Sequence, residues 1–217
     1  AKNFDVTFSF DGDADRLIAL DEQGNIVDGD KNLYIIGKYL KGKDMLKGNI
    51  VVGTSMTNMG IEKAIENLGI KFVREDVGDK YVLRRLLADG GILGGEGSGH
   101  TIMLSESSTG DGVQTAVILA KIIKDSNQKL SNLAQVDIYP QIIKSVEVND
   151  KSIASCKSVV DKVKEIEDSL QASGRVILRP SGTENKIRVM VECQDMAKAQ
   201  ECVRILVDAI NLENDKL

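Results

Sequence analysis

The sequence predicts a mixed α/β domain followed by a smaller α+β domain. Between residues 25 and 130, short apolar runs alternate with amphipathic helical patterns, which is typical of a largely parallel sheet joined by helices. The pattern weakens over the polar residues 127–135. Three strand patterns and two helical patterns follow, which favours an antiparallel sheet with helices on one face. We therefore expect domains at residues 25–132 and 133–217.

The segment before the mixed α/β domain is predicted to be a strand and a hairpin. Residues 4–10 (FDVTFSF) alternate apolar and polar side chains and predict a strand. Residues 16–27 are typical of a hairpin that turns at residues 23–25. Because no partner strand precedes them in the sequence, residues 1–24 resemble the end of a truncated domain.

The mixed α/β domain is predicted to open with a helix over residues 31–40, with Asp30 as its N-cap. A second helix over residues 61–68 ends at Gly69, where glycine most easily adopts the left-handed conformation. Thr109 or Asp111 is expected to cap the last helix of this domain. The other expected elements are strands at 49–53, 70–75, 90–95 and 101–105 and helices at 80–88 and 111–125.

The smaller domain is predicted to contain an antiparallel sheet and two helices. Its strand patterns lie at residues 141–148, 174–180 and 186–193, and its helical patterns lie at 158–171 and 196–210.

Composition narrows the class of protein. The net charge of −5 argues against nucleic acid or an anionic membrane as the main partner. No apolar run is long enough to span a membrane. Cys156, Cys193 and Cys202 are far apart and form no CxxC pair, which indicates free thiols and a cytoplasmic location. His100 is the single histidine, which excludes a multi-histidine zinc site within this chain.

An acidic loop carries the first candidate site. Asp11, Asp13 and Asp15 alternate along the chain, so their carboxylates can converge only around a common centre such as Mg²⁺ or Ca²⁺. Glu22 would complete a calcium EF-hand count, but Arg16 occupies the position that requires glycine. A solvated acidic turn is the other alternative. Magnesium with an adjacent arginine favours a phosphoryl-transfer site.

Two further loops carry polar side chains that suit a ligand, the hydroxyls of a sugar in one loop and an anion in the other. In GGEGSGH (94–100), Glu96 and Ser98 can hold vicinal hydroxyls and His100 can move a proton, although a flexible hairpin is the alternative. In RPSGTENKIR (179–188), two arginines flank a turn whose amides and hydroxyls can bind an anion. A tight hairpin with exposed charges remains open for this segment.

Taken in this order, DGDADR, GEGSGH and RPSGTE followed by IRVMVE resemble the α-D-phosphohexomutase superfamily, and most closely its phosphoglucosamine mutase branch. The resemblance covers essentially the whole chain. It implies the phosphohexomutase-type α/β fold and an active site in the cleft of a four-domain enzyme. In this reading, residues 1–24 end domain 2, residues 25–132 are domain 3, and residues 133–217 are domain 4.

The resemblance also implies a role for each candidate residue. Mg²⁺ would be held by Asp11, Asp13 and Asp15. Arg16 would contact the transferring phosphoryl group, His100 would transfer a proton, and Lys80 would lie near the sugar. Sugar hydroxyls would be held by Glu96 and Ser98. The phosphate that does not react would be bound by Arg179, Ser181, Gly182, Thr183 and Arg188.

The reaction implied is the interconversion of glucosamine 6-phosphate and glucosamine 1-phosphate, through a phosphoserine and a bisphosphorylated sugar. The family's Ser-His-Asn-Pro phosphoserine loop is absent, because the single histidine is followed by Thr101. We therefore expect a fragment that needs the missing N-terminal domains as its partner and is inactive alone. Gly97 and residues 185–186 also depart from the glucosamine branch, which leaves a phosphomannomutase/phosphoglucomutase, or a non-catalytic sugar-phosphate-binding module, as alternatives. A homodimer is left open.

Overall fold

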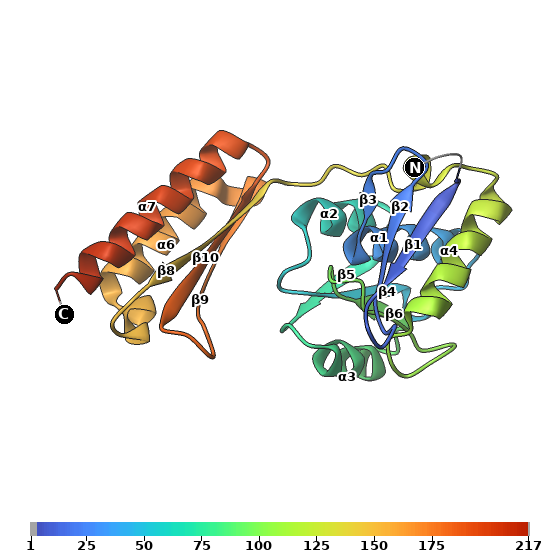
Figure 1. The fold of residues 1–217 in the computed structure, drawn as a ribbon, viewed down its shortest axis with the longest axis horizontal. Coiled ribbons are helices and arrows are strands. Elements are labelled where there is room, and N and C mark those ends of the chain that lie inside the picture. Colours follow the sequence, from blue (N-terminus) through green and yellow to red (C-terminus); the bar gives the residue numbers. More distant parts are fainter. Residues whose placement is uncertain (1–3, 217) are drawn as a thin grey trace. The chain divides into compact units, whose positions relative to one another are not determined.

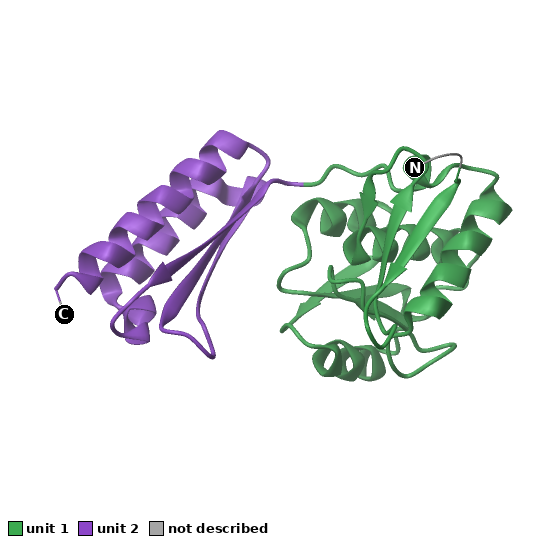
Figure 2. Ribbon diagram, viewed as in Figure 1, with its two compact units in different colours: residues 1–138 green, residues 139–217 purple. Residues whose placement is uncertain are grey.

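The computed structural model describes residues 4–216, which fold into two compact units that divide between Ile138 and Tyr139 (Figure 2). The division lies beyond the boundary predicted at residue 132. The cause is a short helix, α5 (Leu130–Leu133), whose two leucines pack into the core of the first unit.

The first unit begins with a small antiparallel sheet in the order β1 (Val6–Phe10), β2 (Leu17–Asp21) and β3 (Ile26–Val27) (Figure 1). The hairpin predicted at residues 23–25 is confirmed. Asp21 Oδ1 accepts hydrogen bonds from the backbone N–H groups of Gln23 and Asn25, at 2.9 and 2.8 Å. Leu17 and Ala19 of β2 are buried in the core of the first unit, so this segment packs on the α/β layer.

A four-stranded sheet forms the centre of the first unit, in the order β5 (Lys71–Glu75), β4 (Ile50–Thr54), β6 (Leu93–Gly95) and β7 (Thr101–Met103). The first three strands are parallel, as predicted, and β7 adds an antiparallel edge. The principal helices of the unit are α1 (Gly29–Gly42), α2 (Met59–Asn67), α3 (Asp79–Asp89) and α4 (Gly112–Ser126), and a short 3-10 helix, η1 (Lys47–Asn49), precedes β4.

Strand β4 is buried on both faces, as expected for a central parallel strand. Val51 belongs to the core that contains residues of α1, α2 and α4, whereas Val52 belongs to a separate core with Val82 and Leu86 of α3. Helices therefore cover both faces of this sheet, which gives the mixed α/β architecture predicted for the first domain.

The N-cap predicted for the first helix was wrong by two residues. Asp28 caps α1, because its side chain accepts a hydrogen bond from the backbone N–H of Lys31 at 3.0 Å. Asp30 lies inside the first turn and is buried. The sequence places aspartate at both positions, and only tertiary packing distinguishes them. At the last helix of this unit, α4, the predicted cap at Asp111 is confirmed by its hydrogen bond from the Gln114 N–H.

The second unit contains an antiparallel sheet in the order β8 (Gln141–Glu147), β10 (Lys186–Cys193) and β9 (Gly174–Pro180). Its two long helices, α6 (Lys157–Leu170) and α7 (Met196–Asn214), pack on one face of the sheet (Figure 2). Short 3-10 helices, η2 (Lys151–Ser155) and η3 (Gln171–Ser173), flank α6. The core combines both helices with the sheet and includes Val159, Ile166, Val189, Val191 and Leu206. The predicted α+β architecture is confirmed.

No helix among residues 4–216 is both long and apolar enough to cross a lipid bilayer.

Candidate functional site

The acidic loop (residues 11–16) connects β1 to β2 and is closed by the strand pair Phe10–Leu17. Ala14 adopts a left-handed conformation, with φ of 59°, so the loop curls on itself. The backbone N–H of Arg16 donates a hydrogen bond across the loop to Asp11 Oδ1, at 3.2 Å. As a result, one carboxylate oxygen from each of Asp11, Asp13 and Asp15 lies within 4.8 Å of the others.

This donor set fits a hard divalent cation. Three carboxylates converge, and oxygen ligands are those that Mg²⁺ prefers. Asp15 Oδ1 is buried and has no hydrogen-bond partner among the described residues, which leaves it available to a metal. The Arg16 Nε atom lies 3.8 Å from Asp11 and 3.7 Å from Asp15, and its side chain is half-exposed. The arginine thus partly balances the aspartates and keeps donors that face solvent.

His100 lies directly behind the acidic loop. Its Nδ1 atom is 3.1 Å from Asp15 Oδ2, and its backbone pairs with Arg16 in an isolated β-bridge. The residue is only 4% exposed, and its Nε2 atom is buried without a hydrogen-bond partner among the described residues. The ring packs so closely on Gly110 that a Cβ there would lie 2.4 Å from Nε2. Because the ring is buried and contacts a carboxylate oxygen of Asp15, this geometry supports a role for His100 in orienting Asp15.

The glycine-rich loop (residues 94–100) is joined to the end of the acidic loop. Leu17 N–H donates to Gly99 O at 3.1 Å. Gly99 has φ of 101°, and a Cβ at this position would lie 2.4 Å from Leu17 O, so only glycine fits without strain. The structure therefore brings the predicted metal-binding and sugar-binding loops into direct contact, although about 80 residues separate them in sequence.

Glu96 is anchored at the start of α3. Its Oε1 atom accepts a hydrogen bond from the Gly78 N–H at 2.8 Å, and its Oε2 atom accepts one from Ser98 Oγ at 3.3 Å. Lys80 lies in the first turn of the same helix, where its Nζ atom is 4.8 Å from the centroid of the Tyr81 ring. Glu96, Ser98 and Lys80 thus converge on one helix terminus, which the sequence spacing alone did not reveal.

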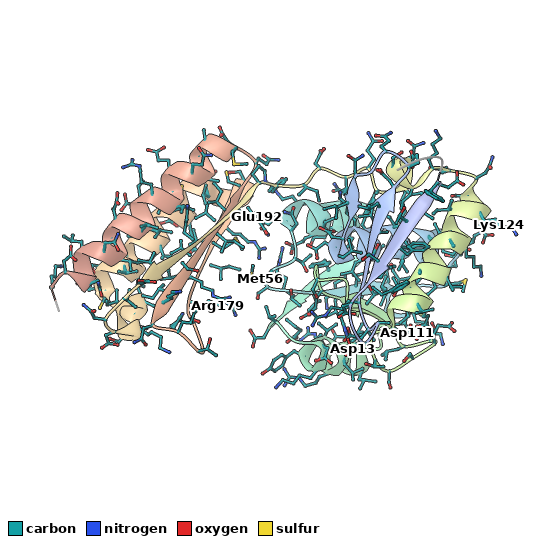
Figure 3. The ribbon with its side chains drawn as sticks, in the orientation of Figure 1. Asp13, Met56, Asp111, Lys124, Arg179 and Glu192 are labelled. Carbon is teal, nitrogen blue, oxygen red and sulfur yellow. The ribbon has the colours of Figure 1, made fainter. Side chains whose placement is uncertain are left out.

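Helix N-termini meet both loops. Gly29, the first residue of α1, donates its N–H to Gly97 O at 3.2 Å. Gly112, the first residue of α4, donates to Ala14 O at 2.9 Å, and Figure 3 shows Asp13 and Asp111 close together at this end of the unit. Helix N-termini carry partial positive charge and favour anions. The ends of parallel strands are also where α/β sheets bind ligands.

The loop that the sequence predicts to bind phosphate (residues 181–185, called the phosphate loop below) connects β9 to β10 within the second unit. Arg179 and Arg188 lie directly opposite each other in the strand register, and Figure 3 labels Arg179 on β9. Like charges placed across strands repel, so an anion between them would relieve an unfavourable contact. Ser181 is buried and donates its N–H to Lys186 O at 2.8 Å. Gly182 and Thr183 are exposed at the turn.

Lys151 was missed by the sequence analysis. Its Nζ atom, on η2, donates to Ser181 O at 3.0 Å and so holds the phosphate loop from outside the motif. A single lysine 30 residues before its partner has no periodicity or spacing that marks it. Only the packing of η2 against β9 and β10 brings it to the loop.

Comparisons with known proteins assign the chain to a family. The family described as phosphoglucomutase/phosphomannomutase, alpha/beta/alpha domain III, matches residues 28–139. The C-terminal domain of the same family matches residues 127–209. The chain therefore belongs to the phosphoglucomutase/phosphomannomutase family.

Curated relatives of this chain include phosphoglucosamine mutases. The phosphoglucosamine mutase of Halalkalibacterium halodurans is 45% identical over 215 residues, which cover 98% of this chain and 48% of that protein. The phosphoglucosamine mutase of Ruminiclostridium cellulolyticum is 48% identical over 210 residues, which cover 93% of this chain and 47% of that protein. The chain thus spans about half the length of the curated relatives it matches.

Solved structures share the fold. Aspergillus fumigatus N-acetylphosphoglucosamine mutase, determined in complex with GlcNAc-6P and magnesium, has a TM-score of 0.80 at 20% identity. The match covers 97% of this chain and 53% of that one. A phosphoglucomutase/phosphomannomutase family protein from Burkholderia thailandensis has a TM-score of 0.74 at 17% identity, with 95% of this chain and 46% of that one covered. At these identities the likeness concerns the fold alone.

Proposed function

We propose that this chain supplies the metal-binding, sugar-binding and phosphate-binding loops of a phosphoglucosamine mutase, which interconverts glucosamine 6-phosphate and glucosamine 1-phosphate. The observation that carries the proposal is the junction of the acidic and glycine-rich loops, through His100–Asp15 and Leu17–Gly99. A mutase needs its phosphoryl-transfer centre and its sugar hydroxyl contacts side by side, and this junction supports that arrangement.

The acidic loop is assigned to the transferring phosphoryl group. Asp11, Asp13 and Asp15 would hold Mg²⁺, which when bound supplies positive charge that stabilises the transferring phosphoryl group. The half-exposed Arg16 guanidinium offers a planar donor fork to the phosphoryl oxygens. His100 keeps Asp15 oriented, because the buried imidazole contacts the carboxylate oxygen Oδ2.

The other loops are assigned to the sugar and its second phosphate. Glu96 and Ser98 would hold sugar hydroxyls, since each oxygen retains a lone pair beyond the hydrogen bonds described above. Lys80 would add a positive charge at the same helix terminus. The phosphate that does not react would be bound by Arg179, Ser181, Gly182, Thr183 and Arg188.

A cytoplasmic location stays a prediction, as does the absence of nucleic-acid and membrane partners. The predicted location is supported by the cysteines, which form no disulfide in the described part of the chain. The partners proposed are the phosphorylated amino sugar and the N-terminal domains that the curated relatives possess.

A chimera tests the proposed function. The N-terminal half of the Halalkalibacterium halodurans phosphoglucosamine mutase described above is joined to this chain. We expect Mg²⁺-dependent turnover of glucosamine 6-phosphate by the chimera and none by the chain alone. The Asp13→Asn chimera is expected to lose this turnover. The control is Asp44→Asn, on an exposed turn, which is expected to keep it.

The other outcomes identify the alternatives. Preference for mannose or glucose phosphates would assign the chain to the phosphomannomutase/phosphoglucomutase branch. A folded chimera that binds glucosamine 6-phosphate without turnover would favour the non-catalytic binding module. Normal turnover by the isolated chain would refute the expectation that it depends on the missing half.

A further inference from the structure

One buried carboxylate belongs to none of the loops described above. Asp30 lies in the first turn of α1 and is 6% exposed. Its Oδ2 atom accepts a hydrogen bond from the backbone N–H of Asn58 at 2.8 Å. The Thr57 hydroxyl donates to the same carboxylate. Asp30 therefore holds the β4–α2 loop (residues 55–58), which leaves the carboxyl end of the central strand.

The same carboxylate lies against the glycine-rich loop. A Cβ built on Gly97 would lie 3.3 Å from Asp30 Oδ1 and 3.5 Å from Oδ2. Oδ1 is buried and has no hydrogen-bond partner among the described residues. The residue before Asp30 reinforces the contact, because Gly29 N–H donates to Gly97 O. The carboxylate thus occupies the space between the β4–α2 loop and the loop that carries Glu96 and Ser98.

The charges around Asp30 come from several elements. Asp28, on the same helix, raises the pKa of Asp30, and Arg74 on β5 lowers it. Glu96 is the charged residue of the glycine-rich loop, whereas the β4–α2 loop presents only neutral groups. Burial is the largest cause and raises the pKa to about 6. Arg74 also donates to the carbonyl oxygens of Thr54 and Thr57, and these hydrogen bonds hold the β4–α2 loop in place.

We propose that Asp30 is a positioning residue that fixes the glycine-rich loop, and with it Glu96 and Ser98, against the β4–α2 loop. Its role in sugar binding rests on the proposed function, but the link between the two loops does not. The ionised carboxylate is a strong acceptor for the Asn58 N–H. Protonation of Asp30 weakens that hydrogen bond and places an O–H beside Gly97. The β4–α2 loop and the glycine-rich loop should therefore both respond to the protonation of Asp30.

Backbone amide NMR on the 217-residue chain between pH 5 and 8 tests this link. We expect the amides of Asn58, Gly97 and Ser98 to share one titration with a midpoint near 6. Asp30→Asn should abolish it and speed amide exchange in both loops about tenfold, because the Asn58 N–H then donates to a neutral amide oxygen and not to a charged carboxylate. The matched control is Asp28→Asn, which keeps a good N-cap and should retain the titration at a lower midpoint.

The proposal would be overturned if the Asn58 amide titrated in the unmodified chain while the amides of Gly97 and Ser98 did not respond. This outcome can be observed even where a variant fails to fold. The second measurement is the affinity of the chimera described above for glucosamine 6-phosphate at pH 7.5. We expect it to fall about tenfold in Asp30→Asn and to be unchanged in Asp28→Asn. If the unmodified chimera does not bind this sugar phosphate, the proposed function fails, while the amide titration of the 217-residue chain still decides the link.

Discussion

The imidazole Nδ1 of His100 lies 3.1 Å from the carboxylate Oδ2 of Asp15, and this contact joins residues 85 positions apart. It connects the loop that fits a metal ion to the loop assigned to the sugar. We therefore expect a shift in either loop to affect the other through this partly buried pair.

Removing His100 should weaken metal binding without removing a ligand. Partners that orient metal ligands typically contribute 10–100-fold in affinity, so we expect His100→Ala to lower the affinity for Mg²⁺ or Mn²⁺ at least about tenfold. Isothermal titration calorimetry on the chain measures it. His100→Asn, which keeps a donor, should recover part of the loss. Equal affinity in the unmodified protein and in a folded His100→Ala variant would show that the ring does not position Asp15.

Gly110 controls the packing of that ring. A Cβ at residue 110 would lie 2.4 Å from His100 Nε2, so Gly110→Ala should cost about 1–3 kcal/mol of unfolding free energy and weaken metal binding. The control is Gly42→Ala at the exposed end of α1, where a Cβ meets nothing within 4 Å. It should stabilise the protein by about 0.4–1 kcal/mol. Chemical denaturation distinguishes the two, and equal effects would contradict the packing argument.

The opposed arginines of the second unit should bind phosphate together. We expect Arg179→Gln and Arg188→Gln each to weaken binding of inorganic phosphate about tenfold, because each removes a charged donor. Each should also raise the melting temperature slightly in phosphate-free buffer, because a like-charge repulsion is relieved. Arg204→Gln, on the exposed face of α7, is the control that should leave phosphate affinity unchanged. A lower melting temperature in either variant would argue against repulsion across the strands.

Asp30 should make the free energy of unfolding depend on pH in the mildly acidic range. Its pKa rises from 3.8 in the unfolded chain to about 6 in the folded protein, so the folded state binds this proton more tightly. The stabilisation by protonation is complete below the unfolded pKa and is lost as pH rises through the folded pKa. A shift of this size corresponds to about 3 kcal/mol. Urea unfolding from pH 4 to 7 should show this decline, and Asp30→Asn should flatten it. An identical pH profile in the variant would contradict the assignment.

Much of the fold could be predicted because its signals are local. The alternation in residues 4–10, the turn at 23–25 and the cap at Asp111 each depend on neighbours within a few positions. The same locality failed at α1, where Asp28 and Asp30 both satisfy the pattern of an N-cap. Burial of Asp30 against the β4–α2 loop decided between them, and no local pattern records that contact.

The candidate site divides in the same way. The sequence by itself determined which chemical groups are present, because the spacing of Asp11, Asp13 and Asp15 fixes how the acidic loop can converge. Only the tertiary structure decided that His100 supports Asp15, that Glu96 is held by Gly78, and that Lys151 reaches the phosphate loop. Each of these contacts joins residues 18 to 85 positions apart. Such pairs are set by the packing of helices and strands, and a pattern of neighbouring residues contains no information about them.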